Sequence, residues 1–97
     1  MNKADRKENI QSITDRLIYY LKIEDPDLDI ELVYSNKKIV SRYISIIDRN
    51  INQYIVRVSD HNNNRQETYH HNIVIKHYEE FKVCSHVMDI VANINNR

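Results

Sequence analysis

The segment KIVSRYISIIDRNINQYIVRVSD, residues 38–60, decides the fold. β-Branched and aromatic residues are frequent on both sides of the short polar stretch at its centre, and these residue types fit the pleated surface of a sheet. We therefore predict two strands, over Lys38–Asp48 and Gln53–Asp60, which are joined through Arg49–Asn52 and pair antiparallel as a hairpin.

Two more strands are predicted around this hairpin. Residues Asp27–Tyr34 alternate between apolar and acidic side chains, with Leu28, Ile30 and Leu32 on one side, and this period of two is typical of a strand. Residues Gln66–Val74 are expected to form the last strand, after an asparagine-rich loop.

The sequence on either side of the strands has helical periodicity. Apolar residues recur at spacings of three and four over Asp5–Ile23, which predicts an amphipathic helix. A second apolar stripe runs along Ile75–Asn93, and it places Cys84, Val87 and Met88 on the buried side of a closing helix.

These elements follow one another in the order α-β-β-β-β-α. Amphipathic helices at both ends need a sheet on which to bury their apolar sides, so the predicted fold class is α+β. We expect an antiparallel meander of three to four strands, flanked by the N-terminal and the C-terminal helix in two layers. A chain of 97 residues without repeats or flexible linkers is predicted to form one domain, residues 1–97.

Charge and hydropathy narrow the classes of function. Hydrophobic residues make up 41% of the chain and charged residues 29%, which argues against disorder. The 14 basic and 14 acidic residues cancel, which disfavours both a globally basic nucleic-acid binder and a globally acidic nucleic-acid mimic. No stretch approaches the roughly 20 apolar residues of a membrane span, and Met1–Glu8 lacks the apolar part of a secretory signal. The expectation is a cytoplasmic protein without membrane contact.

The chain contains no glycine. A glycine-rich phosphate loop is therefore absent, and any turn residue with positive φ has to be of another type. Asparagine tolerates positive φ best among the remaining types, so we predict this conformation at one or more of Asn50, Asn52, Asn62, Asn63 and Asn64.

The basic hairpin is the main candidate for a binding surface. With the strands joined through a loop of four residues, Ile44 lies opposite Arg57 and Ile46 lies opposite Ile55. Arg42 then shares this face, and arginine among aliphatic side chains is typical of protein-binding surfaces. The predicted partner-binding residues are Arg42, Arg57, Ile44, Ile46, Ile55, Lys37 and Lys38.

The opposite face of the hairpin, with Tyr43, Ile47, Tyr54, Val56 and Val58, is then the core side. Two other interpretations of the arginine face stay open. Either the N-terminal helix covers it and the arginines reach the rim of that helix, or a second copy of the chain docks on it as a homodimer.

Nucleic-acid binding is the alternative function. Residues 37–65 carry six basic residues against two acids, and basic side chains on a hairpin can hold phosphates. The residues that would do so are Lys37, Lys38, Arg42, Arg49, Arg57 and Arg65.

An acidic run precedes the hairpin, with five acids and no base over residues 24–31. The spacing from Asp25 is similar to the start of an EF-hand calcium loop, but position six is Ile30 instead of glycine and position twelve is Asn36 instead of glutamate. We expect the acids on the solvent side of an edge strand, where they discourage aggregation. This secondary surface comprises Asp25, Asp27, Asp29 and Glu31.

No catalytic residue, metal site or cofactor is predicted. The five histidines are scattered along the sequence beside a single cysteine, whereas a metal site needs three or four converging ligands. Cys84 lies seven residues from His77 and two from His86, and neither spacing brings the side chains together on a helix. The expectation is a protein that is not an enzyme.

The segment QYIVRV (residues 53–58), its asparagine-rich turn and the closing helix resemble parts of small anti-CRISPR inhibitors. Ile, Asn, Lys, Tyr and Phe total 42 residues, a composition that indicates an AT-rich genome, and the chain is similar to accessory proteins of phages and mobile elements of low-GC Gram-positive bacteria. The resemblance implies a non-enzymatic phage or mobile-element protein that inhibits or redirects a host protein, with a defence nuclease as one candidate. The neutral charge departs from the strongly acidic inhibitors that mimic nucleic acid.

Overall fold

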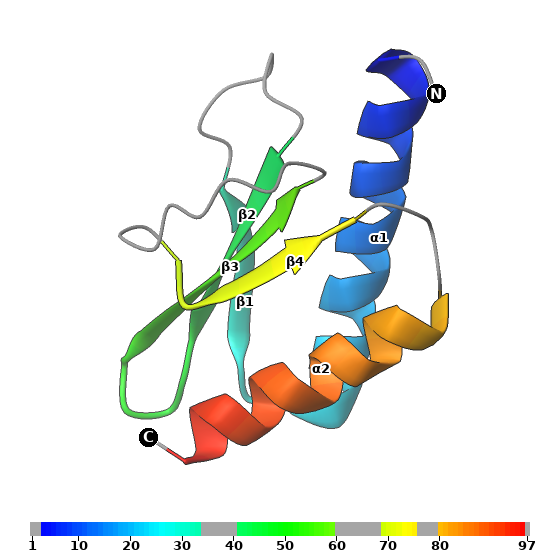
Figure 1. The fold of residues 1–97 in the computed structure, drawn as a ribbon. Coiled ribbons are helices and arrows are strands. Elements are labelled where there is room, and N and C mark those ends of the chain that lie inside the picture. The colour runs from blue at the N-terminus through cyan, green and yellow to red at the C-terminus, as the bar shows by residue number, and fades with distance from the viewer. Residues whose placement is uncertain (1–2, 34–40, 60–68, 76–79, 97) are drawn as a thin grey trace.

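The computed structural model describes residues 3–33, 41–59, 69–75 and 80–96. Its elements are α1 (Lys3–Glu24), β1 (Asp29–Val33), β2 (Ser41–Ile47), β3 (Gln53–Ser59), β4 (His71–Val74) and α2 (Glu80–Asn95), shown in Figure 1. The predicted order α-β-β-β-β-α and the α+β class are therefore confirmed. Among the described residues, no helix is long and apolar enough to cross a membrane.

The four strands form one mixed sheet in the order β1-β2-β3-β4. The pairs β1–β2 and β2–β3 are antiparallel as predicted, but β4 runs parallel to β3. The prediction of an antiparallel meander is wrong at this last step, because β4 begins opposite Val56, in the middle of β3, and runs in the same direction as β3. Parallel pairing requires a crossover connection, whereas antiparallel strands can be joined by a tight turn.

The element boundaries differ from the predicted ones by a few residues at most ends. Helix α1 begins two residues earlier than predicted, and β1 is shorter at its start because Pro26 and Asp27 lie in a turn. The predicted parts of strands at 34, 38–40, 60 and 66–68 lie outside the described residues, as does the predicted helix start at 76–79. Ile75 itself follows β4 and is not helical.

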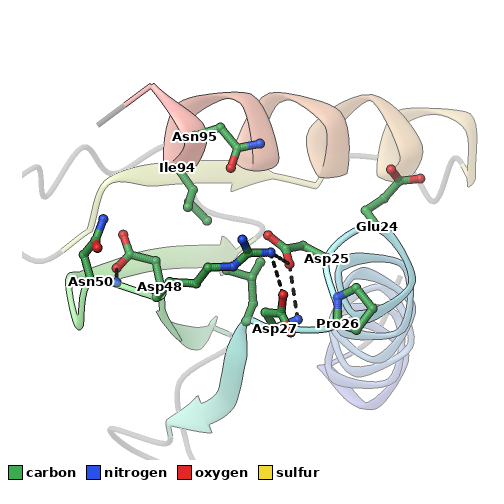
Figure 2. Close-up of a pocket in the computed structure, with 10 residues that line it drawn as sticks. Glu24, Asp25, Pro26, Asp27, Asp48, Asn50, Ile94 and Asn95 are labelled. Atoms are coloured by element: carbon green, nitrogen blue, oxygen red, sulfur yellow. Dashed lines mark hydrogen bonds and ion pairs between the residues drawn. The ribbon is translucent and has the colours of Figure 1, made fainter.

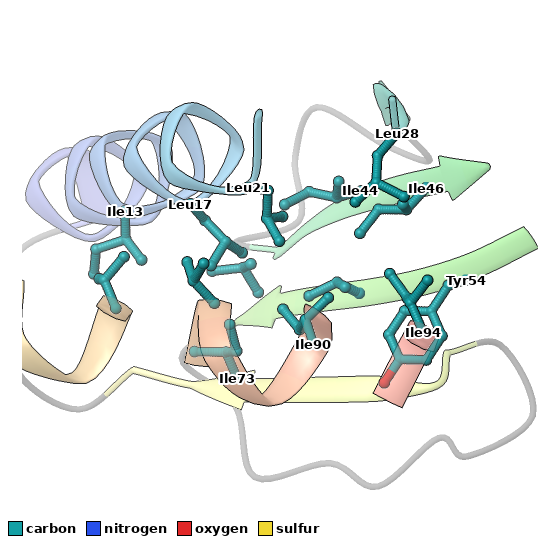
Figure 3. Close-up of a cluster of buried hydrophobic side chains, with 14 of the residues drawn as sticks. Ile13, Leu17, Leu21, Leu28, Ile44, Ile46, Tyr54, Ile73, Ile90 and Ile94 are labelled. Carbon is teal, nitrogen blue, oxygen red and sulfur yellow. The ribbon is translucent and has the colours of Figure 1, made fainter. Parts of the chain in front are cut away.

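Both helices pack on the same face of the sheet, so the two-layer prediction is confirmed (Figure 3). Ile13, Leu17 and Leu21 of α1 meet Ile90 and Ile94 of α2 above the strands. The strands contribute their buried hydrophobic side chains from one face only, and these are Ile44, Ile46, Tyr54, Val56, Val58 and Ile73. Val87 of α2 is 2% exposed, as its place on the predicted stripe requires, whereas Cys84 and Met88 are exposed, contrary to prediction.

The turn between β2 and β3 has three residues instead of the predicted four. The Asp48 amide donates to the Asn52 carbonyl at 3.1 Å, and the Ile51 amide donates to the Asp48 carbonyl at 3.0 Å. The Asp48 carboxylate also accepts the amides of Asn50 and Asn52, each at 2.9 Å. This turn pairs Ile47 with Gln53 and Ile46 with Tyr54, one residue away from the predicted register.

A shift of one residue moves every side chain of a strand to the other face of the sheet. Tyr43 pairs with Arg57 and Ile44 pairs with Val56, so Ile44 and Arg57 lie on opposite faces. Ile44 and Ile46 are fully buried in the core, together with three residues of the face that was predicted to oppose them. The predicted Arg42/Arg57 surface is therefore wrong.

The turn also places a β-branched residue in the left-handed region. A three-residue hairpin turn needs positive φ at its last residue, where glycine is usual. That residue is Ile51, with φ of 64°. The prediction of an asparagine in this conformation is wrong for Asn50 and Asn52, and Asn62–Asn64 lie outside the described residues.

Candidate functional site

The residues predicted to bind a partner do not form one surface. Arg42 lies on the helix side of the sheet, where its Nε donates to Gln11 Oε1 of α1 at 3.1 Å. The alternative of an arginine at the rim of the N-terminal helix therefore describes Arg42. Ile55 lies on the far face of the sheet and is half-buried, as part of the same face as Arg57. Lys37, Lys38 and Arg65 lie outside the described residues.

Arg57 is a buried part of the sheet, with 4% of its surface exposed. Its guanidinium donates to Asn72 Oδ1 at 3.1 Å and to Ser59 Oγ at 3.2 Å, and it lies over the Tyr69 ring, 5.7 Å from the ring centre. Ser41 Oγ in turn donates to Ser59 Oγ at 3.1 Å. These bonds join β2, β3 and β4 across the face that turns away from the helices. Arg57 is therefore structural rather than available to a partner.

The acidic run divides between two places. Asp29 and Glu31 lie on the exposed far face of β1, as predicted for an edge strand. Asp25 and Asp27 instead turn into a cleft of about 430 Å³, between the end of α1, the β2–β3 turn and the last turn of α2 (Figure 2). The lining residues are Glu24, Asp25, Pro26, Asp27, Leu28, Asp48, Arg49, Asn50, Ile94 and Asn95.

The cleft carries a negative charge. Glu24, Asp25, Asp27 and Asp48 contribute four carboxylates against the one guanidinium of Arg49, so the lining has a formal charge of −3. Arg49 Nη2 donates to Asp27 Oδ2 and lies 3.8 Å from Asp25 Oδ1. Because the Arg49 side chain is 71% exposed, water screens these contacts and they contribute little to stability.

Ile51 projects from the turn that forms one wall of this cleft. It follows Asp48, Arg49 and Asn50 in the chain and is 83% exposed, more than any other large hydrophobic residue among the described residues. Its side chain is therefore unfavourable in two respects, because it is apolar in water and because it is β-branched at positive φ. The hairpin presents this side chain without any packing benefit to the folded chain.

The sequence analysis did not predict that Ile51 projects from the turn that lines the cleft. The signal was the pattern Asp48-Arg49-Asn50-Ile51, since aspartate at the first position of a type I turn can accept the amides that follow it. With three turn residues instead of four, that pattern would have placed the isoleucine at the left-handed position. The approach of Asp25 and Asp48 depends on tertiary packing and has no local signal.

Histidines from β4 and α2 meet on the helix side of the sheet. His71 Nε2 and His86 Nδ1 are 3.0 Å apart, and the rings are nearly perpendicular at 82°. Burial lowers the pKa of both imidazoles below 6.5; the charge of His86 lowers that of His71 further, while Asp89 partly opposes the shift in each. Within the described part of the chain, no three His, Cys, Asp or Glu side chains are grouped so as to hold a metal ion.

Comparisons with known proteins add no relatives: no family model, no curated protein and no solved structure matches this chain.

Replacement of Ile51 by glycine is expected to stabilise the protein. Glycine removes the steric cost of positive φ, about 1–2 kcal/mol. Part of this gain is offset, because glycine raises the conformational entropy of the unfolded chain. The net gain in the free energy of unfolding should be about 0.5–1 kcal/mol, measured by urea titration. The matched control is Asn50→Gly, at a residue without positive φ, which should gain nothing. Equal effects at both positions would contradict the strained conformation of Ile51.

Proposed function

We propose that this chain is a non-enzymatic binding protein that holds a segment of another protein between the Ile51 tip and the acidic cleft. The observation that carries the proposal is Ile51, which is 83% exposed and adopts a conformation that isoleucine avoids. Strained backbone commonly occurs where a contact with a ligand requires it. A partner that covers Ile51 would turn an unfavourable exposed side chain into an anchor.

The charge of the cleft defines the partner's chemistry. A formal charge of −3 around an open hollow favours a segment that carries lysine or arginine beside an apolar residue. Such a segment would compete with Arg49 for Asp25 and Asp27. Because Arg49 is exposed and its ion pairs are weak, its displacement would cost little.

The origin and the host partner are part of the same proposal. The AT-rich codon signature and the resemblance to small phage and mobile-element proteins support a chain that acts in a host cytoplasm on a host protein. A defence nuclease is one candidate, because the nucleic-acid-binding surfaces of such enzymes are basic.

Affinity capture from the lysate of a low-GC Gram-positive bacterium tests the proposal. The wild-type chain should retain one protein in near-stoichiometric amount. Asp25→Asn with Asp27→Asn should reduce the captured amount about tenfold or more. The variant removes the two carboxylates that pair with Arg49 and that the partner's lysine or arginine would bind. The matched control, Asp29→Asn with Glu31→Gln, removes the same charge from the far face of β1 and should capture as well as wild type. Capture of nothing, or equal loss in both variants, would count against this site.

Nucleic-acid binding has less support than the binding of a protein segment. The three described arginines of the hairpin point to three places: Arg42 to α1, Arg49 to the carboxylates of the cleft, and Arg57 into the far face of the sheet. Phosphate binding through one continuous groove would need them on a common surface. A gel-shift assay at low salt with DNA and RNA decides this alternative, which predicts a shift that weakens steeply as salt is added.

A further inference from the structure

We propose that the His71–His86 contact is a pH-sensitive latch, which holds β4 against α2 near neutral pH and opens this joint in mild acid. The proposal is independent of the binding function. It concerns the place where the short edge strand of the sheet meets the C-terminal helix, as seen in Figure 1.

The latch depends on a single shared proton. His71 Nε2 and His86 Nδ1 are at hydrogen-bond distance, 3.0 Å, so in the neutral pair one nitrogen donates and the other accepts. A first added proton can go to a nitrogen outside this bond and leave the bond intact. A second proton must occupy the accepting nitrogen, which removes the bond and leaves two cations in contact.

Apart from the histidine contact, β4 and α2 are held together only weakly. Strand β4 has four residues and lies at the edge of the sheet, where β3 is its one neighbour among the described strands. The backbone of α2 lies closer to that of α1 than to the strands. A small cavity of about 30 Å³ lies where α1, β4 and α2 meet, and His86 is among the residues that line it. Separation of β4 from α2 therefore leaves the α1–α2 core in place.

The charged groups around the pair come mainly from α2. Asp89 raises the pKa of both imidazoles, and Lys82 lowers that of His86. From α1, Ile13 and Leu17 line the neighbouring cavity and are uncharged. The adjacent His70 is engaged elsewhere, since its Nδ1 accepts the Ile55 amide at 2.9 Å and its ring stacks on Tyr54.

The sign of the pH dependence follows from these shifts. Burial, the largest cause, lowers the pKa of both histidines below their ordinary value of 6.5 in the closed state. Well above pH 6.5 the closed and the open states are both neutral, so the latch is fully effective. As the pH falls below 6.5, the open state takes up protons that the closed state refuses, and opening becomes more favourable.

Hydrogen exchange and histidine NMR on the intact chain test the latch. Between pH 7.5 and 5.5, after correction for intrinsic exchange rates, the amides of Ile73 and of Ile75, which donates to the Ser59 carbonyl, should lose at least tenfold more protection than that of Ile44 in β2. The ring ¹⁵N signals of His71 and His86 should titrate below pH 6.5 in the same experiment. His86→Gln should reduce the extra loss in β4, because His71 alone then takes up a proton on opening, whereas the control His70→Gln should leave it unchanged.

Three results would overturn the proposal. The first is titration of either ring at or above pH 6.5 in the wild-type chain, which needs no variant to fold. The second is β4 protection that follows Ile44 at every pH. The third is a His86→Gln chain with the wild-type profile, or a His70→Gln chain that loses it, since either result would assign the proton uptake to another group.

Discussion

Val87→Asp is expected to unfold the protein. Val87 is 2% exposed and lies in the core cluster that α2 forms with α1 and the sheet. An aspartate at this position would bury a carboxylate among apolar side chains, and the described core offers it no cation. The free energy of unfolding should fall by about 4 kcal/mol or more, which is most of the stability of a domain of this size. Circular dichroism at 25 °C should show the loss of helical signal.

The adjacent Met88 supplies the control for this variant. Met88 is 55% exposed, so Met88→Asp introduces the same charge on the same helix without burying it. Its melting temperature should stay within a few degrees of wild type, in line with the small effects of surface substitutions. A folded Val87→Asp chain with a wild-type melting temperature would show that the face of α2 is assigned wrongly.

Arg57→Ala is expected to have the second largest effect. The variant deletes the donors to Asn72 and Ser59 and removes the group that lies over the Tyr69 ring, all on a face of the sheet where Arg57 is nearly inaccessible to water. Loss of hydrogen bonds from a charged group, with the buried Ser59 hydroxyl left behind, should cost about 2–4 kcal/mol in the free energy of unfolding. Urea titration measures it.

Arg49→Ala is the matched control, because it removes the same side chain from a largely exposed position. It should change the free energy of unfolding by no more than about 0.5 kcal/mol. The pair of variants separates two views of the hairpin. If Arg57 formed part of an exposed binding surface, as its sequence context suggested, its removal would be as mild as that of Arg49.

The periodicity of the sequence was sufficient to predict the helices and strands, their order and the two layers. Alternation over residues 28–32 and the spacing of Leu17, Leu21, Val87 and Ile94 each have a single physical interpretation, and the structure confirms them. These patterns are local, because a strand or a helix buries the face that its own residues define. They carry no information on which strand end meets which helix.

The register of the hairpin could not be obtained in the same way. Both faces of β2 and β3 carry aliphatic residues, so hydrophobicity did not distinguish Ile55 from Val56 as the residue that faces the core. The length of the turn decided it, through the hydrogen bonds of Asp48 to Asn50, Ile51 and Asn52. One residue of loop length thus moved Arg57 from a predicted surface into a buried network.

The candidate site and the latch depend on contacts between distant residues. Asp25 and Asp48 line the same cleft only because the end of α1 lies beside the β2–β3 turn, and His71 reaches His86 only because β4 is parallel to β3. Neither contact can be predicted from the pattern of neighbouring residues in the sequence. The sequence predicted a strand over residues 66–74, but a strand pattern does not indicate whether the strand runs parallel or antiparallel to its neighbour.

The most direct test of the binding account is the affinity of Ile51→Gly for the protein that the wild-type chain captures. Burial of an isoleucine side chain in an interface contributes about 1.5–3 kcal/mol, so the variant should bind about tenfold more weakly or worse. The same variant should be at least as stable as wild type, which excludes misfolding as the cause. A stable Ile51→Gly chain that binds its partner with wild-type affinity would contradict the account.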